Sequence, residues 1–165
     1  MRRGSTPSPT YFMKPGELVV SSDPLLVTTL LGSCVAVTMY NPRLRLGAIC
    51  HALLPKCRRE QTCSQVETGK YVECAIGALL SELATRGVLN SEIEAKLFGG
   101  SDMFDSDEGG RYGVGRQNQE MALRLLGEAE VKVVTRDLGG PRGRKIIFRT
   151  DTGEVFLKRL RKTEV

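Results

Sequence analysis

The sequence predicts an α+β fold in a single domain, with layered mixed β-sheets and two principal helices packed on one side. Many short β-rich runs are separated by Gly, Pro, Asn and Asp, whereas only two segments show the apolar spacing of an amphipathic helix. The 165 residues are 41% hydrophobic and 26% charged. A chain of this length can form one core that buries roughly 68–70% of the surface exposed by the unfolded chain.

Residues 1–15 are expected to form a flexible N-terminal tail, and residues 16–165 the domain. The first segment contains Arg, Ser, Thr, Pro and Gly where a secretory signal would have its apolar run. No stretch approaches the roughly 20 apolar residues that span a bilayer. These features predict a soluble cytoplasmic protein.

The first half of the domain is predicted to contain four strands. Residues 17–20 and 25–31 form two short runs, and residues 34–40 and 45–54 form two longer runs. The last two flank Asn41-Pro42-Arg43-Leu44, a sequence typical of a turn because Asn is favoured at its first position and Pro at its second.

If that turn is tight, strand partners have numbers that sum to 85, and Cys34 faces His51. Directly opposed residues on one sheet face have Cβ atoms about 4.5–5.5 Å apart, close enough for a thiol to meet an imidazole. A longer loop could change the register, and a shift by one residue would send the two side chains to opposite faces.

The second half of the chain is predicted to repeat a helix, a strand and a Gly-Gly pair. Residues 71–86 carry apolar side chains at helical spacing, and the strand at 93–98 ends in Gly-Gly. Residues 117–128 and 131–135 repeat the helix and the strand before a second Gly-Gly pair. Residues 145–160 close the chain as a hairpin around Asp-Thr-Gly.

Cys34 and His51 are the candidate catalytic pair. Gly32 and Ser33 interrupt the apolar run directly before Cys34, and His51 is the only histidine in the chain. A neighbouring imidazole can activate a thiol and later protonate a leaving amine. The backbone around Gly32 and Ser33 is the candidate support for an oxyanion.

Catalytic histidines are usually oriented by a third group, and two threonines are candidates for that role. Thr29 lies on the strand that leads to Cys34, and its hydroxyl could accept a hydrogen bond from an imidazole N–H. Thr28 is the alternative and would point to the other face of an extended segment.

We expect the remaining cysteines to be reduced and mostly inert thiols. Five cysteines in a chain without export features argue against a disulfide framework. Zinc binding by Cys50, His51, Cys57 and Cys63 is disfavoured, because their spacings are wider than those of structural zinc sites and adjacent strand residues point apart. We therefore expect no metal and no cofactor.

Basic residues concentrate in the C-terminal quarter and account for much of the net charge of +5. Such a patch could bind nucleic acid, a membrane surface or an acidic protein. No aromatic residues alternate with these charges to stack bases, so a solvated strand face without nucleic-acid binding is favoured. The residues are Arg142, Arg144, Lys145, Arg149, Lys158, Arg159, Arg161 and Lys162.

Several separate motifs resemble, in order, those of the chemoreceptor glutamine deamidases, the CheD family. They cover nearly the whole chain after Pro15, although Gln117 stands where the family usually has arginine. The motifs are LLGSCVAV at 30–37, HALLP at 51–55, GKYVECAI at 69–76, AKLFGGSDMF at 95–104, RDLGG at 136–140 and GRK at 143–145.

This resemblance implies a Cys–His–Thr triad of Cys34, His51 and Thr29. It implies hydrolysis of selected glutamine side chains in methyl-accepting chemotaxis receptors, giving glutamate and ammonia. The implied partners are the receptor cytoplasmic domains and, as in many members of the family, a CheC-type phosphatase of the response regulator CheY.

A binding module that acts on a CheC-type phosphatase or a receptor by contact alone is the alternative function. Replacement of Cys34 by alanine would abolish the effect of an enzyme and leave the effect of such a module unchanged.

Overall fold

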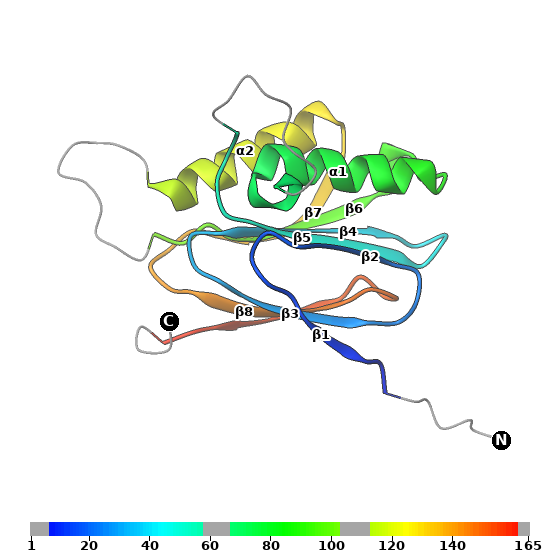
Figure 1. Ribbon diagram of the computed structural model, residues 1–165, viewed down its shortest axis with the longest axis horizontal. Coiled ribbons are helices and arrows are strands. Elements are labelled where there is room, and N and C mark those ends of the chain that lie inside the picture. The colour runs from blue at the N-terminus through cyan, green and yellow to red at the C-terminus, as the bar shows by residue number, and fades with distance from the viewer. Residues whose placement is uncertain (1–6, 58–66, 103–112, 162–165) are drawn as a thin grey trace.

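The computed structural model describes residues 7–57, 67–102 and 113–161. Two stacked β-sheets form two layers, and two α-helices form a third layer on the outer side of one sheet (Figure 1). This arrangement confirms the predicted α+β class with both helices on one side. In chain order the elements are β1 (Thr10–Phe12), β2 (Leu18–Ser21), β3 (Leu26–Leu31), β4 (Val35–Asn41), β5 (Leu46–Ala52), α1 (Val72–Thr85), β6 (Glu94–Gly99), α2 (Val114–Glu128), β7 (Lys132–Leu138), β8 (Arg144–Arg149) and β9 (Val155–Arg159), with short 3₁₀ helices at Thr68–Lys70 and Asn90–Glu92.

The five-stranded sheet has the order β2-β5-β4-β6-β7, and α1 and α2 cover its outer face. Apolar side chains of α1 recur at helical spacing and pack against this face, as Val72, Ile76 and Leu79 illustrate. Neither helix in the described part of the chain is long and apolar enough to cross a membrane.

The four-stranded sheet has the order β1-β3-β8-β9 and packs against the other face of the five-stranded sheet. The layer between the sheets contains Ile49, Phe98 and Phe148, all less than 4% exposed. Alternation along β5 places Cys50 toward the helices and both neighbours, Ile49 and His51, toward the four-stranded sheet.

The segment predicted as a flexible tail contributes to the fold. Residues 10–12 form β1, which pairs in parallel with β3, and Met13 is 5% exposed in the layer between the sheets. The backbone N–H of Met13 also donates to the carbonyl of Thr28 at 2.8 Å. A three-residue edge strand has too few side chains to produce a recognisable alternation in the sequence.

The two predicted helix, strand and Gly-Gly units lie side by side. β6 and β7 are adjacent and parallel, and their Gly-Gly pairs adopt positive φ angles of 104° and 62° at Gly99 and Gly100 and of 79° and 77° at Gly139 and Gly140. The Gly139 N–H donates to the Gly99 carbonyl at 2.9 Å. The loops that follow β6 and β7 are therefore hydrogen-bonded to each other at the C-terminal ends of these two strands.

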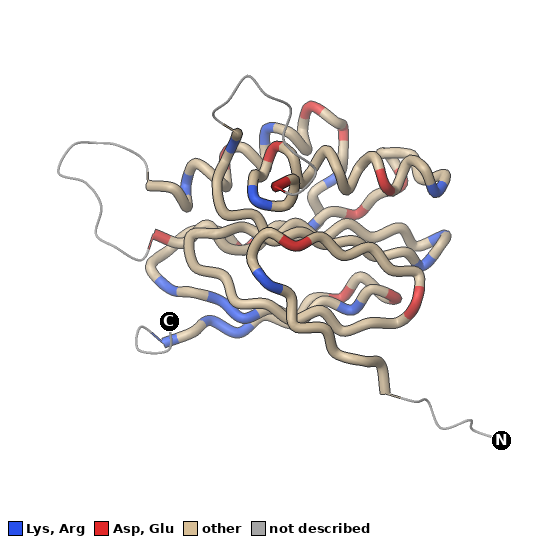
Figure 2. Tube along the Cα trace, in the orientation of Figure 1, with Lys and Arg blue, Asp and Glu red and all other residues tan. Residues whose placement is uncertain are grey.

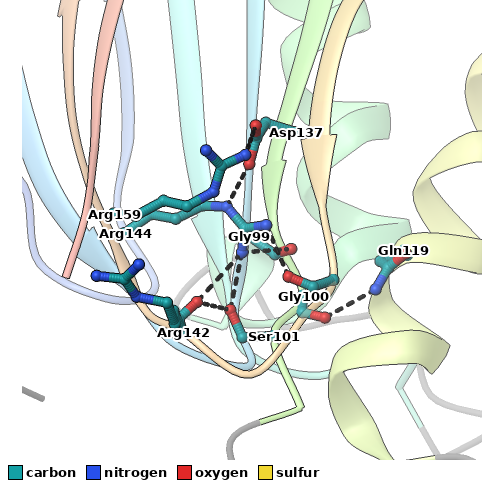
Figure 3. A network of polar contacts seen from close by, with 9 residues as sticks. Gly99, Gly100, Ser101, Gln119, Asp137, Arg142, Arg144 and Arg159 are labelled. Atoms are coloured by element: carbon teal, nitrogen blue, oxygen red, sulfur yellow. Dashed lines mark hydrogen bonds and ion pairs between the residues drawn. The ribbon is translucent and has the colours of Figure 1, made fainter. Parts of the chain in front are cut away.

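A buried arginine joins the two sheets beside these loops. Arg144 of β8 is 3% exposed, and its Nε donates to Asp137 of β7 at 2.7 Å. Its other nitrogens donate to Ser101 Oγ at 2.8 Å and to the Gly139 carbonyl at 2.7 Å. Figure 3 shows this network, in which Arg159 also pairs with Asp137.

The predicted basic surface is therefore smaller than the sequence indicated. Figure 2 shows lysines and arginines along the C-terminal strands β8 and β9. Arg144, however, is buried between the sheets, where it pairs with Asp137.

Candidate active site

Cys34 lies where the chain crosses from the four-stranded to the five-stranded sheet. It stands between the end of β3 and the start of β4 and is partly buried. Its carbonyl accepts a hydrogen bond from the Gly100 N–H at 2.8 Å, and the Gly32 carbonyl accepts one from the Ser101 N–H at 3.0 Å. Gly32, Ser33 and Cys34 form the connection between β3 and β4, which we call the Cys34 loop. The Gly99–Ser101 segment therefore holds both sides of this loop.

Gly99 makes this close approach of two backbones possible. A Cβ atom at position 99 would lie 2.2 Å from the Cys34 carbonyl oxygen, far inside van der Waals contact. Its φ of +104° is also a conformation that side chains disfavour.

His51 lies on β5 in the layer between the sheets and is 1% exposed. Its strand partner is Ala36, whereas the sequence predicted Cys34. The prediction was wrong by two residues, because four residues connect β4 and β5 and Arg45 among them adopts a φ of 51°.

A shift of two residues preserves the predicted face. Cys34 packs with Ala36 between the sheets, whereas Val35 faces the helices. Cys34, one residue before β4, and His51 on β5 therefore both face the layer between the sheets, as the shared-face prediction requires.

Thr29 comes to His51 from the opposite sheet. Its Oγ1 lies 2.7 Å from His51 Nδ1 and 2.9 Å from the Met13 carbonyl oxygen. A carbonyl can only accept, so the hydroxyl hydrogen goes to Met13 and the hydroxyl oxygen accepts from Nδ1–H. Thr28 pairs with Ile147 on the other face of its strand, and Thr29 is therefore the threonine that contacts the imidazole.

This tautomer leaves His51 Nε2 as the basic atom. Nε2 is buried and has no hydrogen-bond partner among the described residues, so the structure does not join it to the Cys34 thiol. Catalytic hydrogen bonds are often long or misaligned before substrate binds. The structure brings Thr29 and His51 into contact and places Cys34 against the same layer between the sheets.

Burial keeps both candidate reacting groups neutral. It lowers the pKa of His51 from 6.5 to about 4 and raises the pKa of the Cys34 thiol. Near neutral pH the pair is therefore a thiol and a neutral imidazole that can accept a proton.

The carbonyls of Gly32 and Ser33 are occupied by structural hydrogen bonds. Gly32 accepts from Ser101, and Ser33 accepts from the side-chain amide of Asn118 at 3.0 Å. These bonds fix the loop in which the Ser33 and Cys34 N–H groups lie. The oxyanion role of this backbone stays a prediction.

Sequence reasoning missed Asn118, although a local signal was present. Asn118, Ala122 and Leu126 follow at intervals of four residues on the buried side of α2, and Asn118 is 0% exposed. A polar amide within an apolar stripe requires buried partners.

The cysteines do not all remain reduced, which corrects the sequence expectation. Cys74 in α1 is disulfide-bonded, whereas Cys34, Cys50 and Cys57 are free thiols. Full burial raises the pKa of Cys50 to about 12, as expected for an inert core thiol. Cys63 lies outside the described residues.

The zinc alternative gains no support within the described ranges. There, no three His, Cys, Asp or Glu side chains form a group that could hold a metal ion. Cys50 and His51 point to opposite faces of β5, as their adjacency in a strand requires.

Comparison with known proteins places the chain in a family. The family model described as "CheD chemotactic sensory transduction" matches residues 53–159. This range contains none of Thr29, Cys34 and His51, so the match does not depend on the candidate triad.

Three relatives align over most of the chain. The "Probable chemoreceptor glutamine deamidase CheD 2" of Geobacter sulfurreducens is 44% identical over 156 residues, which cover 94% of this chain and 93% of the relative. The "Probable chemoreceptor glutamine deamidase CheD" of Maridesulfovibrio salexigens is 37% identical over 92% of each chain. The "Probable chemoreceptor glutamine deamidase CheD 1" of Anaeromyxobacter dehalogenans is 36% identical over 90% of this chain and 84% of the relative. On these matches, the chain belongs to the CheD family.

Proposed function

We propose that this protein is a chemoreceptor glutamine deamidase with Cys34 as nucleophile, His51 as general base and acid, and Thr29 as the residue that orients His51. The names of its relatives support the activity and the substrate class. The observation that carries the proposal is the 2.7 Å contact between Thr29 Oγ1 and His51 Nδ1, which leaves a buried basic Nε2 on the face of Cys34.

Acylation begins with transfer of the Cys34 thiol proton to His51 Nε2 as Sγ attacks the side-chain amide carbon of the glutamine. The low pKa of His51, about 4, means that the imidazole is neutral and available as a base near neutral pH. As the ring gains charge, its Nδ1–H bond to Thr29 becomes charge-assisted and stronger. The backbone N–H groups of Ser33 and Cys34 are proposed to stabilise the oxyanion.

Collapse of the tetrahedral intermediate breaks the carbon–nitrogen bond. His51 returns its proton to the leaving nitrogen, which departs as ammonia, and a thioester to Cys34 remains. Water then attacks the thioester with His51 again as base. Glutamate is released and the Cys34 thiol is restored, so the reaction needs neither metal nor cofactor.

The proposed setting rests on the family to which the chain belongs. Receptor cytoplasmic domains are the substrates, a CheC-type phosphatase is a regulatory partner, and the cytoplasm is the compartment in which they meet. The proposed partners include no nucleic acid.

The experiment incubates the purified protein with a receptor cytoplasmic fragment and identifies new glutamates by peptide mass spectrometry. A helical coiled-coil protein of similar glutamine content serves as the control substrate. We expect conversion at a few receptor sites and none in the control. Absence of new glutamate in several receptor fragments, or equal conversion of the control, would contradict the proposal.

A further inference from the structure

Asn118 connects the segments that adjoin the two candidate catalytic residues Cys34 and His51. It lies near the start of α2 and is 0% exposed. Its Nδ2 donates to the Ser33 carbonyl at 3.0 Å and to the Leu53 carbonyl at 2.9 Å. One side-chain amide therefore holds the residue before Cys34 and the second residue after His51.

These two bonds begin where the backbone pairing of β4 and β5 stops. The last paired residues at this end are Val35 and Ala52. Continuing the register would place Cys34 opposite Leu53, one step beyond the ladder. Just beyond this last pair, the two N–H groups of the Asn118 amide bind the Ser33 and Leu53 carbonyls. They therefore hold the two chain segments together where the backbone hydrogen bonds between β4 and β5 end.

The choice of an amide at this buried position has a cost. Asn118 Oδ1 is buried and has no hydrogen-bond partner among the described residues. A buried polar atom without a partner destabilises the folded state. An apolar side chain would avoid that cost and continue the stripe of Ala122 and Leu126, but it would leave the carbonyls of Ser33 and Leu53 without their donor.

We infer that Asn118 is a positioning residue that fixes the Cys34 loop relative to His51. The inference rests on the proposed deamidase function, and Asn118 acts through Ser33 and Leu53 without touching the reacting atoms. A displacement of about 1 Å in a catalytic group can reduce the rate by roughly 100-fold. Loss of this amide is therefore expected to lower kcat far more than it changes KM.

The test compares Asn118→Ala and Asn118→Ser with Asn41→Ala. Asn41 lies at the opposite end of β4, is also 0% exposed, and donates its Nδ2 to the Glu92 carbonyl at 3.0 Å. It therefore controls for loss of a buried amide-to-carbonyl hydrogen bond away from Cys34. Thermal unfolding, kcat and KM on a receptor fragment, and the rate of Cys34 alkylation by iodoacetamide, located by peptide mapping, are measured for each protein.

We expect Asn118→Ala to lower kcat roughly 100-fold with KM within about twofold, and Asn118→Ser, which keeps one donor, to lower kcat less. Release of the loop should expose the thiol and speed Cys34 alkylation severalfold. Asn41→Ala should be destabilised similarly but keep the wild-type kcat and alkylation rate. If the Asn118 variants change either rate no more than Asn41→Ala does, the inference is wrong.

Alkylation requires no deamidase activity, and it therefore separates the two proposals. Faster Cys34 alkylation in the Asn118 variants of a protein that deamidates no receptor would support the positioning role and contradict the proposed function. Should Asn118→Ala fail to fold, Asn118→Ser decides the outcome by the same two rates.

Discussion

Thr29 and His51 come from different sheets, and a 2.7 Å contact between Oγ1 and Nδ1 joins them. The threonine hydroxyl donates to the Met13 carbonyl and can therefore serve the imidazole only as an acceptor. This relationship selects the tautomer of the single histidine and leaves Nε2 as its basic atom.

Replacement of Thr29 by valine should lower kcat/KM by roughly 10–100-fold. Valine keeps the shape of threonine but leaves the His51 Nδ1–H without an acceptor, at a cost of about 1–3 kcal/mol. Deamidation of a receptor fragment measures the effect. Thr28→Val is the matched control, because Thr28 lies on the other face of β3, and it should retain activity within about twofold. Equal losses in both variants would argue against the orienting role of Thr29.

His51 should remain neutral down to acidic pH. Burial lowers its pKa from 6.5 to about 4, and it is the only histidine, so its NMR signals need no separation from others. We expect the imidazole C–H shifts to titrate well below the ordinary range. A midpoint near 6.5 would contradict this prediction, because it would show that the surroundings of the ring do not disfavour its charged form.

The same shift makes stability depend on pH. Because the pKa is lower in the folded than in the unfolded state, the unfolded chain binds more protons between the two values. The contribution of neutral His51 is complete above about pH 6.5 and is lost as pH falls toward 4. Its full size is about 3 kcal/mol. Urea unfolding of wild type and His51→Gln between these limits should show the steeper pH dependence in wild type.

Gly99→Ala should damage both stability and activity. The new Cβ would lie 2.2 Å from the Cys34 carbonyl oxygen, at a φ of +104°. Strain and overpacking should lower the free energy of unfolding by more than about 2 kcal/mol, and displacement of the Cys34 loop should slow deamidation.

Gly77→Ala provides the control for this substitution. Gly77 lies in α1, and a Cβ there meets nothing within 4 Å. It should stabilise the protein by about 0.5–1 kcal/mol, because alanine favours a helix. Chemical denaturation compares the two, and equal stability would contradict the predicted clash.

Arg144→Met should destabilise the stacking of the two sheets by about 3 kcal/mol. The substitution removes a buried guanidinium and leaves Asp137, Ser101 and the Gly139 carbonyl without its donors. Arg159→Met removes a half-exposed partner of the same carboxylate and should cost less than about 1 kcal/mol. Urea denaturation measures both losses. A similar loss for the two variants would show that Arg144 has no special role.

Much of the fold was accessible from the sequence, because strands and helices have distinct periodicities. The apolar spacing in α1 and the Gly-Gly pairs after β6 and β7 are local features, and they predicted the order of elements. β1 was missed because its three residues gain strand structure only by pairing with β3. The disulfide at Cys74 was missed because export features and cysteine counts do not determine pairing.

The catalytic candidates were predictable in part. Alternation predicted that Cys34 and His51 share a face, and this held although the register differed by two residues. The difference arises because four residues connect β4 and β5, whereas the prediction assumed a two-residue connection. The Asn-Pro-Arg-Leu sequence is compatible with either length. The apolar stripe of α2 marked Asn118 as a buried amide, but its role could not be assigned, because its partners lie 85 and 65 residues away in the chain.

The central claim is that Cys34 is the nucleophile of receptor deamidation, and substitution of single cysteines tests it most directly. Wild type, Cys34→Ala and Cys50→Ala are incubated with the same receptor fragment, and glutamate formation is quantified by mass spectrometry. Cys50 is a fully buried free thiol that faces the helices, so it controls for loss of a cysteine. We predict that Cys34→Ala folds and forms no glutamate, whereas Cys50→Ala remains active. Glutamate formation by folded Cys34→Ala at the wild-type rate would contradict the account.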